Sequence, residues 1–203
     1  MNTILLKRGE DIELKLMTAL ASHDCLTAYQ CVAAVYGNHT PAAVSGMLRK
    51  LKTMIEKGLI GRKESGDGIY RYYLNTAGVR TINVHINFEA TPGHDRSYLN
   101  SSRHDKLINK IIADSYTFEN ETRVLGRGAL RRIQNGKFSD IDGMLGVRDG
   151  DKFKTVKIYA KIDNAGPVGV DKLARVEKRA LQLNTKLVVI SNEFTLKLLG
   201  LKK

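Results

Sequence analysis

The sequence predicts an α+β protein built from two small domains. Three observations support this fold class. Residues 14–82 show helical apolar periodicity followed by a short glycine-rich hairpin, residues 83–102 are polar and contain Pro92 and Gly93, and residues 103–203 return to helices and strands. A chain of 203 residues with 42% hydrophobic content is long enough for two folded domains. We therefore expect a leader over residues 1–13, a first domain, a linker and a second domain.

The stretch from Thr40 to Asn75 has the clearest local pattern. Thr40 is a good helix N-cap, and Pro41 suits the first helical position, where its missing N–H costs nothing. Apolar residues then recur at three- and four-residue steps up to Gly58, which is well placed for the left-handed position after a helix end. The predicted apolar stripe consists of Val44, Met47, Leu48, Leu51, Met54 and Ile55. Two strands around a basic, glycine-rich tip follow this helix.

Two further helical segments come before this stretch. One covers residues 14–21, and the other covers residues 28–36 after the N-cap Thr27. Helix, helix, short turn, helix and hairpin is the order of a winged helix-turn-helix, whose third helix lies in the DNA major groove. The alternative is an unrelated amphipathic helix followed by a hairpin. The candidate base-contacting residues are His39, Thr40, Ala42, Ser45 and Arg49, and the candidate phosphate-contacting residues are Lys50, Lys52, Arg62, Lys63 and Arg71.

The composition favours a polyanionic partner. The chain has 33 Lys+Arg against 21 Asp+Glu, which gives a formal net charge of +12. Such a surplus of cations attracts nucleic acid. Aromatic residues make up only 6% of the chain and Trp is absent, which argues against a platform that stacks single-stranded bases. We therefore expect duplex DNA as the partner.

Other residue patterns exclude several classes of protein. Cys25 and Cys31 have neither CxxC nor zinc spacing, so both are expected to be buried, reduced residues. His85, His94 and His104 lack metal-ligand spacing, so we expect no structural metal. No stretch resembles a signal peptide or reaches the roughly 18 apolar residues of a membrane span. The sequence predicts a cytoplasmic protein without membrane contact.

The second domain is expected to start with a helix over residues 104–116 that has an apolar face. Three extended segments follow at residues 121–132, 138–147 and 153–162, then a helix marked by Leu173, Val176, Ala180 and Leu183, and a buried strand at residues 186–191. The third segment alternates: Val156, Ile158, Ala160 and Ile162 are expected on one face, and Lys157, Tyr159, Lys161 and Asp163 on the other.

This order of elements, with Ser139-Asp140 on the second strand and Tyr159-Ala160-Lys161 on the third, resembles the PD-(D/E)xK nuclease-like fold. The resemblance implies that Asp140 holds Mg²⁺ and that Lys161 assists the attacking water, so these two are the candidate catalytic residues. Tyr159 stands where the second acid is expected, and a phenol is a poor ligand for a hard metal. Glu121, Asp142 and Asp163 are candidate replacements, which makes Asp140, Asp142 and Glu121 the candidate metal ligands.

Three interpretations of this domain stay open: an inactive nuclease-like scaffold, a working nuclease or nickase, and an unrelated α/β domain. Asp140 and Lys161 also have a purely structural alternative, an ion pair across adjacent strands.

The whole chain also resembles one family. The segment Arg49–Ile60 (RKLKTMIEKGLI), in a first domain of winged-helix order, precedes a nuclease-like domain that opens on a helix with His104. This combination resembles the replication-relaxation family of plasmids and related mobile elements, which includes mobilisation accessory proteins. The resemblance implies origin binding or local regulation in a plasmid, phage or other mobile element.

Two main function classes follow. In the favoured class, the protein is a duplex-DNA-binding regulator or mobilisation accessory factor without a cofactor. Its second domain is then inactive and serves for homodimerisation, for docking a protein partner or for additional phosphate contact. The alternative is an Mg²⁺-dependent endonuclease or nickase targeted by the winged helix. A third class, interaction only, would use the basic helix over residues 171–186 to dock an acidic partner.

Overall fold

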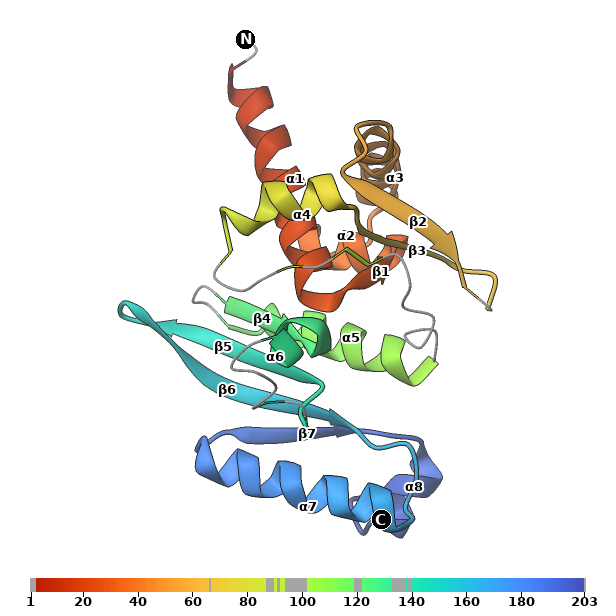
Figure 1. The fold of residues 1–203 in the computed structure, drawn as a ribbon, viewed down its shortest axis with the longest axis vertical. Coiled ribbons are helices and arrows are strands. Elements are labelled where there is room, and N and C mark those ends of the chain that lie inside the picture. The colour runs from red at the N-terminus through yellow and green to blue at the C-terminus, as the bar shows by residue number, and fades with distance from the viewer. Residues whose placement is uncertain are drawn as a thin grey trace. The chain divides into compact units, whose positions relative to one another are not determined.

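The computed structural model describes residues 3–65, 67–86, 90, 92–93, 102–118, 122–132, 138 and 140–202. The protein belongs to the α+β class, as predicted, and its described residues form two separate sheets. The chain divides into two compact units, Met1–Asn100 and Ser101–Lys203 (Figure 1). Each unit is described by itself below. Among the described residues, no helix is long and apolar enough to cross a membrane.

The first unit contains four helices and a small sheet in its described part. Its elements are α1 (Thr3–His23), β1 (Cys25–Thr27), α2 (Ala28–Tyr36), α3 (Pro41–Glu56), β2 (Ile60–Glu64), β3 (Tyr70–Leu74) and α4 (Thr76–Asn83). The sheet has the order β1-β3-β2, and both pairings are antiparallel. Its core contains Leu16 and Leu20 of α1, Met47 and Leu51 of α3, and Ile60 of β2. Cys25 and Cys31 are free and buried, as predicted.

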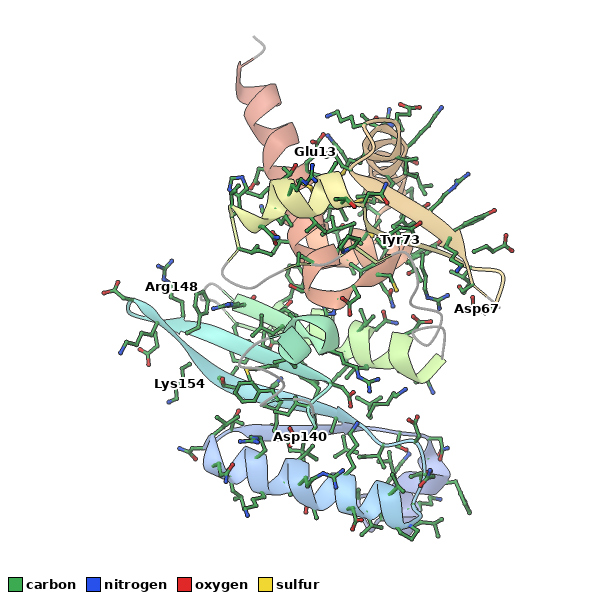
Figure 2. All side chains as sticks on the ribbon, viewed as in Figure 1. Glu13, Asp67, Tyr73, Asp140, Arg148 and Lys154 are labelled. Carbon is green, nitrogen blue, oxygen red and sulfur yellow. The ribbon has the colours of Figure 1, made fainter. Side chains whose placement is uncertain are left out.

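The leader expected over residues 1–13 does not form a separate segment from Thr3 onward, because these residues are the first half of α1. Glu13 connects this helix to another part of the unit. Its carboxylate accepts hydrogen bonds from the ammonium groups of Lys50 (3.0 Å) and Lys57 (3.1 Å) (Figure 2). The N-terminal helix is thereby joined by charge-assisted hydrogen bonds to α3 and to the residue that follows it.

The predicted ends of α3 are confirmed. The Thr40 side chain accepts a hydrogen bond from the Ala43 N–H at 3.2 Å. After the helix, Gly58 has φ +70°, and the Leu59 N–H donates to the Met54 carbonyl at 3.0 Å. This is the glycine-dependent Schellman ending, in which a left-handed residue turns the chain out of the helix. It directs the chain into β2.

Part of the connection expected over residues 83–102 packs on the first unit instead of lying exposed. The Gly93 N–H donates to the Leu74 carbonyl at 3.1 Å, and a Cβ at Gly93 would collide with Tyr73 (Figure 2). Ala90 is buried, and its N–H donates to the Asn83 side chain at 2.9 Å. Backbone hydrogen bonds therefore fix this part of the connection, although its composition is that of a loop. Most of the other residues between 87 and 101 lie outside the described residues.

The second unit is a four-stranded sheet with a helix on each face. Its elements are α5 (Ser102–Ser115), β4 (Thr122–Gly126), α6 (Arg127–Arg132), β5 (Gly143–Asp149), β6 (Lys152–Lys161), α7 (Pro167–Gln182), β7 (Lys186–Ile190) and α8 (Glu193–Leu198). The strand order is β4-β5-β6-β7; the first two pairings are antiparallel, and β7 runs parallel to β6. Leu107 and Ile111 of α5 pack against Tyr159, whereas Leu173 and Val176 of α7 pack against Ala160 and Ile162.

Three details of the second unit differ from the sequence prediction. The extended segment expected over residues 138–147 forms a strand only from Gly143, and this strand runs on to Asp149. The extended segment expected over residues 121–132 forms a strand only from Thr122 to Gly126, and Arg127–Arg132 form a helix. The strict alternation expected along β6 is wrong at Val156, which packs with Tyr159 instead of with Ala160 and Ile162. A register shift opposite this residue is the cause: Lys157 pairs with Leu145, and Thr155 pairs with Gly146. A bulge of this kind changes the face on which a side chain lies.

We expect Gly58→Ala to lower the free energy of unfolding by about 1 kcal/mol, because a Cβ is strained at positive φ. Gly46→Ala is the matched control. Gly46 is inside α3, and a Cβ there would meet no atom within 4 Å. The control should raise stability by about 0.5–1 kcal/mol, since alanine favours a helix. Urea unfolding of both variants measures the two values, and equal effects would contradict the assigned helix end.

Candidate functional site

The exposed face of α3 is the strongest candidate surface in the first unit. Met47, Leu51 and Met54 are buried and hold the helix against the core. Positions at steps of three and four residues on the other side are exposed, as the geometry of a helix requires. These exposed residues are Ala42, Ser45, Leu48, Arg49 and Lys52. All five predicted base-contacting residues, including His39 and Thr40 before the helix, are exposed. Leu48 was expected in the apolar stripe but is 47% exposed.

The turn before α3 is fixed by contacts with α2. The His39 Nε2 atom lies 3.0 Å from the Tyr29 carbonyl, and the two rings are 5.6 Å apart. The Tyr29 ring is 65% exposed. Sequence reasoning did not select Tyr29 as a site residue. Helical periodicity could have predicted its exposure, because Tyr29 lies in the first turn of α2 and the residues that follow it, Gln30, Cys31 and Val32, are the buried ones.

The hairpin of β2 and β3 adds an exposed cationic strand. Arg62 and Lys63 are both exposed on β2. The Arg62 guanidinium lies 4.9 Å from the centre of the Tyr70 ring, a cation–π contact that restricts the arginine side chain. Tyr70 and Ile69 themselves remain about half exposed, at 45% and 46%. The hairpin thus presents cations beside apolar surface.

Arg71 does not fit its predicted role as a phosphate contact. It is only 4% exposed, and its guanidinium donates to both Asp67 carboxylate oxygens at 3.0 and 2.9 Å. Asp67 lies at the hairpin tip (Figure 2), where it also accepts from the Ser65 hydroxyl at 2.7 Å and the Ile69 N–H at 3.1 Å. Hydrogen bonds from Arg71 and Ser65 hold the pKa of Asp67 well below its usual range. Arg71 therefore stabilises the tip from inside.

Lys50 is also used internally. Its side chain is about one quarter exposed and pairs with Glu13, which Lys57 contacts as well. Burial alone would raise the pKa of Glu13, but the hydrogen bonds from the two lysines lower it. Lys52, by contrast, is largely exposed and lies 4.0 Å from Glu56, too far for a strong ion pair. Of the predicted phosphate-contacting residues, Lys52, Arg62 and Lys63 thus remain exposed and available to contact phosphate.

The second unit contains the predicted catalytic and metal-binding residues, and Asp142 is the most buried of those described. It is only 2% exposed. One carboxylate oxygen, Oδ2, accepts from the Lys172 ammonium at 2.6 Å and from the Lys161 N–H at 2.7 Å. The other, Oδ1, lies 3.3 Å from the Arg127 Nε atom. Both oxygens are therefore engaged by cations or by a backbone N–H.

Asp140 and Lys161 do not form the ion pair that was considered for them. Asp140 (Figure 2) lies 3.9 Å from Arg179 of α7. The Lys161 ammonium lies 3.6 Å from Asp163. Asp140 and Asp142 both precede β5, so the placement of Asp140 on the second strand is wrong. Glu121 and Ser139 lie outside the described residues, as do His94 and the side chain of His104.

Tyr159 is turned into the core of the second unit. Its hydroxyl donates to Asp114 of α5 at 2.9 Å, and its ring packs with Leu107 and Ile111. Burial and the negative charge of Asp114 raise the pKa of Tyr159 far above its usual value. Lys110 and Lys157 also contact Asp114, at 2.9 and 3.2 Å. A neutral phenol held in this way offers no negative ligand to a metal.

These residues do not fit a divalent metal centre. In the part of the chain that the structure describes, no three Asp, Glu, His or Cys side chains gather as ligands. Asp142 is neutralised from two sides, Asp140 lies 3.9 Å from Arg179, and the Tyr159 hydroxyl is hydrogen-bonded to Asp114. A hard cation such as Mg²⁺ needs open carboxylate oxygens. The described cluster offers a structural charge network instead.

We expect the contribution of the Asp67–Arg71 pair to stability to be lost in acid. Because folding lowers the pKa of Asp67, this contribution is fully present above the unfolded-state pKa of about 3.9 and declines as pH falls below it. Urea unfolding of wild type and Asp67→Asn tests this. The advantage of wild type should be largest near pH 7 and shrink towards pH 2. An advantage that does not change with pH would contradict the assigned ion pair.

Comparison of the chain with protein families, with curated proteins and with solved structures finds no match, so the geometry described above carries the functional argument.

Proposed function

We propose that the chain is a duplex-DNA-binding protein whose first unit acts as a winged helix. The observation that carries this proposal is the two-sidedness of α3. Its apolar residues are buried in the core, while Ala42, Ser45 and Arg49 are exposed together on the other side. Small residues near the start of a helix allow close approach to base edges, and an arginine in the next turns has the reach and geometry to contact guanine.

The order of elements and the hairpin support the same proposal. Helix, short strand, helix, helix and antiparallel hairpin is the order of a winged helix-turn-helix. Arg62 and Lys63 on the hairpin, and Lys52 on α3, supply exposed cations for phosphate contact. The formal net charge of +12 strengthens attraction to a polyanion at long range.

For the second unit, we propose an inactive nuclease-like scaffold. Its helix, strands and parallel last strand have the order of the PD-(D/E)xK fold, but its charge cluster does not fit a metal. Together, the two domains favour a regulator of replication or transcription, or a mobilisation accessory factor, of a plasmid, phage or other mobile element. The resemblance to the replication-relaxation family motivates this biological setting.

We expect Arg49→Ala to weaken binding to the specific DNA site by about 1–3 kcal/mol while affecting random duplex much less, because a base-edge contact is lost. Arg80→Ala is the matched control, an exposed arginine on α4. The site is first selected from a random duplex library, and gel shifts then measure both affinities. Equal losses of affinity for the specific and the random duplex would contradict the proposal that α3 contacts base edges.

We expect Lys63→Ala to weaken binding to all duplexes by a similar factor, since a phosphate contact carries no sequence information. The slope of log affinity against log salt should become shallower by about 1 for this lost contact. A salt titration from low to physiological salt measures the slope for wild type and variant. An unchanged slope would remove the hairpin from the proposed interface.

A further inference from the structure

We propose that the second unit contains a cation site that the chain fills itself, with the Lys172 ammonium as its occupant. This inference refines the nuclease-like scaffold of the proposed function and does not depend on DNA binding by the first unit. The site is built where β5 begins, where β6 ends and along the first half of α7. Its test is therefore separate from any test of DNA recognition.

The ligands around the ammonium are oxygens of the type that a hard cation uses. The Lys172 Nζ atom lies 2.6 Å from Asp142 Oδ2 and 2.8 Å from the Lys161 carbonyl oxygen. Carboxylate and backbone carbonyl oxygens are the usual ligands of Mg²⁺, Mn²⁺ and Ca²⁺ in proteins. A lysine ammonium presents a single positive charge to them from a covalently attached side chain.

The position of the oxygens is fixed by the backbone. The Asp142 N–H donates to the Tyr159 carbonyl at 2.8 Å, and the Asp142 carboxylate accepts from the Lys161 N–H at 2.7 Å. Asp142 is thereby held at both its backbone and its side chain to the end of β6. Because the oxygens are preorganised, removing the ammonium leaves them in place.

An uncompensated Asp142 would be costly. The residue is 2% exposed, and the interior favours a charged carboxylate only when it is paired. Arg127 lies on the other side at 3.3 Å from Oδ1 and supplies part of the compensation. With Arg127 and Lys172 both present, an added divalent ion would meet two positive charges around one carboxylate. Without Lys172, only Arg127 compensates the carboxylate, and the Asp142 Oδ2 and Lys161 carbonyl oxygens lose the cation between them.

The structure also explains why an arm from α7 reaches this point. Gly169, one turn before Lys172, lies so close to the Asn164 carbonyl that a Cβ would collide with it. The first turn of α7 therefore lies against the loop that leaves β6. Leu173 and Val176 then anchor the helix on the sheet through Ala160 and Ile162. Lys172 is thus directed towards Asp142 by packing on both sides of it.

The test measures thermal unfolding of the full chain in EDTA and in increasing MnCl₂. For wild type, we expect the same Tm in both conditions. Lys172→Ala should lower the Tm by about 5–15 °C in EDTA, because a buried carboxylate loses a partner. Mn²⁺ should then recover part of this loss. The double variant Asp142→Asn/Lys172→Ala should show no response to Mn²⁺, and Lys178→Ala, an exposed lysine of the same helix, should behave as wild type.

Two results would overturn the proposal. One is a rise of the wild-type Tm with Mn²⁺ that Asp142→Asn abolishes, since the metal would then bind beside Lys172. The other is a folded Lys172→Ala that does not respond to Mn²⁺. If Lys172→Ala does not fold, the wild-type titration and the double variant Lys172→Met/Asp142→Asn test the proposal instead. The proposal requires that this uncharged double variant folds and that its Tm does not change with Mn²⁺. If it does not fold, or if its Tm rises with Mn²⁺, the proposal fails.

A plasmid assay adds a second readout. Supercoiled DNA incubated with wild type and Mn²⁺ should remain uncut, because the cation position is already occupied. Nicking by wild type that Asp142→Asn removes would contradict the proposal. A gel shift on the same samples tests DNA binding separately from the cation site. Loss of DNA binding would count against the proposed function, whereas the Mn²⁺ response of the Tm is independent of DNA.

Discussion

The packing of α3 against the core of the first unit determines the character of its surface. Met47, Leu51 and Met54 are almost fully buried, and each such side chain contributes about 1.5–3 kcal/mol when it leaves water. Three residues on one side of a helix fix its rotation, because neighbouring positions are separated by 100°. The direction of Ser45 and Arg49 follows from this packing. The proposed DNA-reading face thus depends on the same apolar contacts that stabilise the fold.

The two units use charge in different ways. In the first, Arg71 forms an ion pair with Asp67 at the hairpin tip. Lys50 forms an ion pair with Glu13, which joins α1 to α3. Lys52 on α3, and Arg62 and Lys63 on β2, remain exposed. In the second, acids and bases neutralise one another around Asp142 and Asp114. A surface with exposed cations suits binding of a polyanion, and a neutralised interior suits a scaffold.

Burial on both faces explains the composition of the second sheet. Tyr159 and Ala160 are adjacent in β6 and both inaccessible, one under α5 and the other under α7. This leaves polar groups such as the Tyr159 hydroxyl without water, and Asp114 satisfies it by a hydrogen bond. Lys110 and Lys157 then compensate the charge of Asp114. The buried hydroxyl is thus paired with a carboxylate, and the carboxylate is paired with two ammonium groups.

The sequence by itself determined the local features of this protein. The N-cap at Thr40, the helix end at Gly58, the apolar side of α3 and the α+β class follow from neighbours a few residues apart, so a linear pattern contains them. Tertiary structure decided which charges are available. Arg71 and Arg62 look alike in the sequence, yet one is buried against Asp67 and the other is exposed. Lys172 and Asp142, 30 residues apart, meet only because β6 and α7 bring them together. Ion pairs of this kind depend on distance in space, which no local periodicity records.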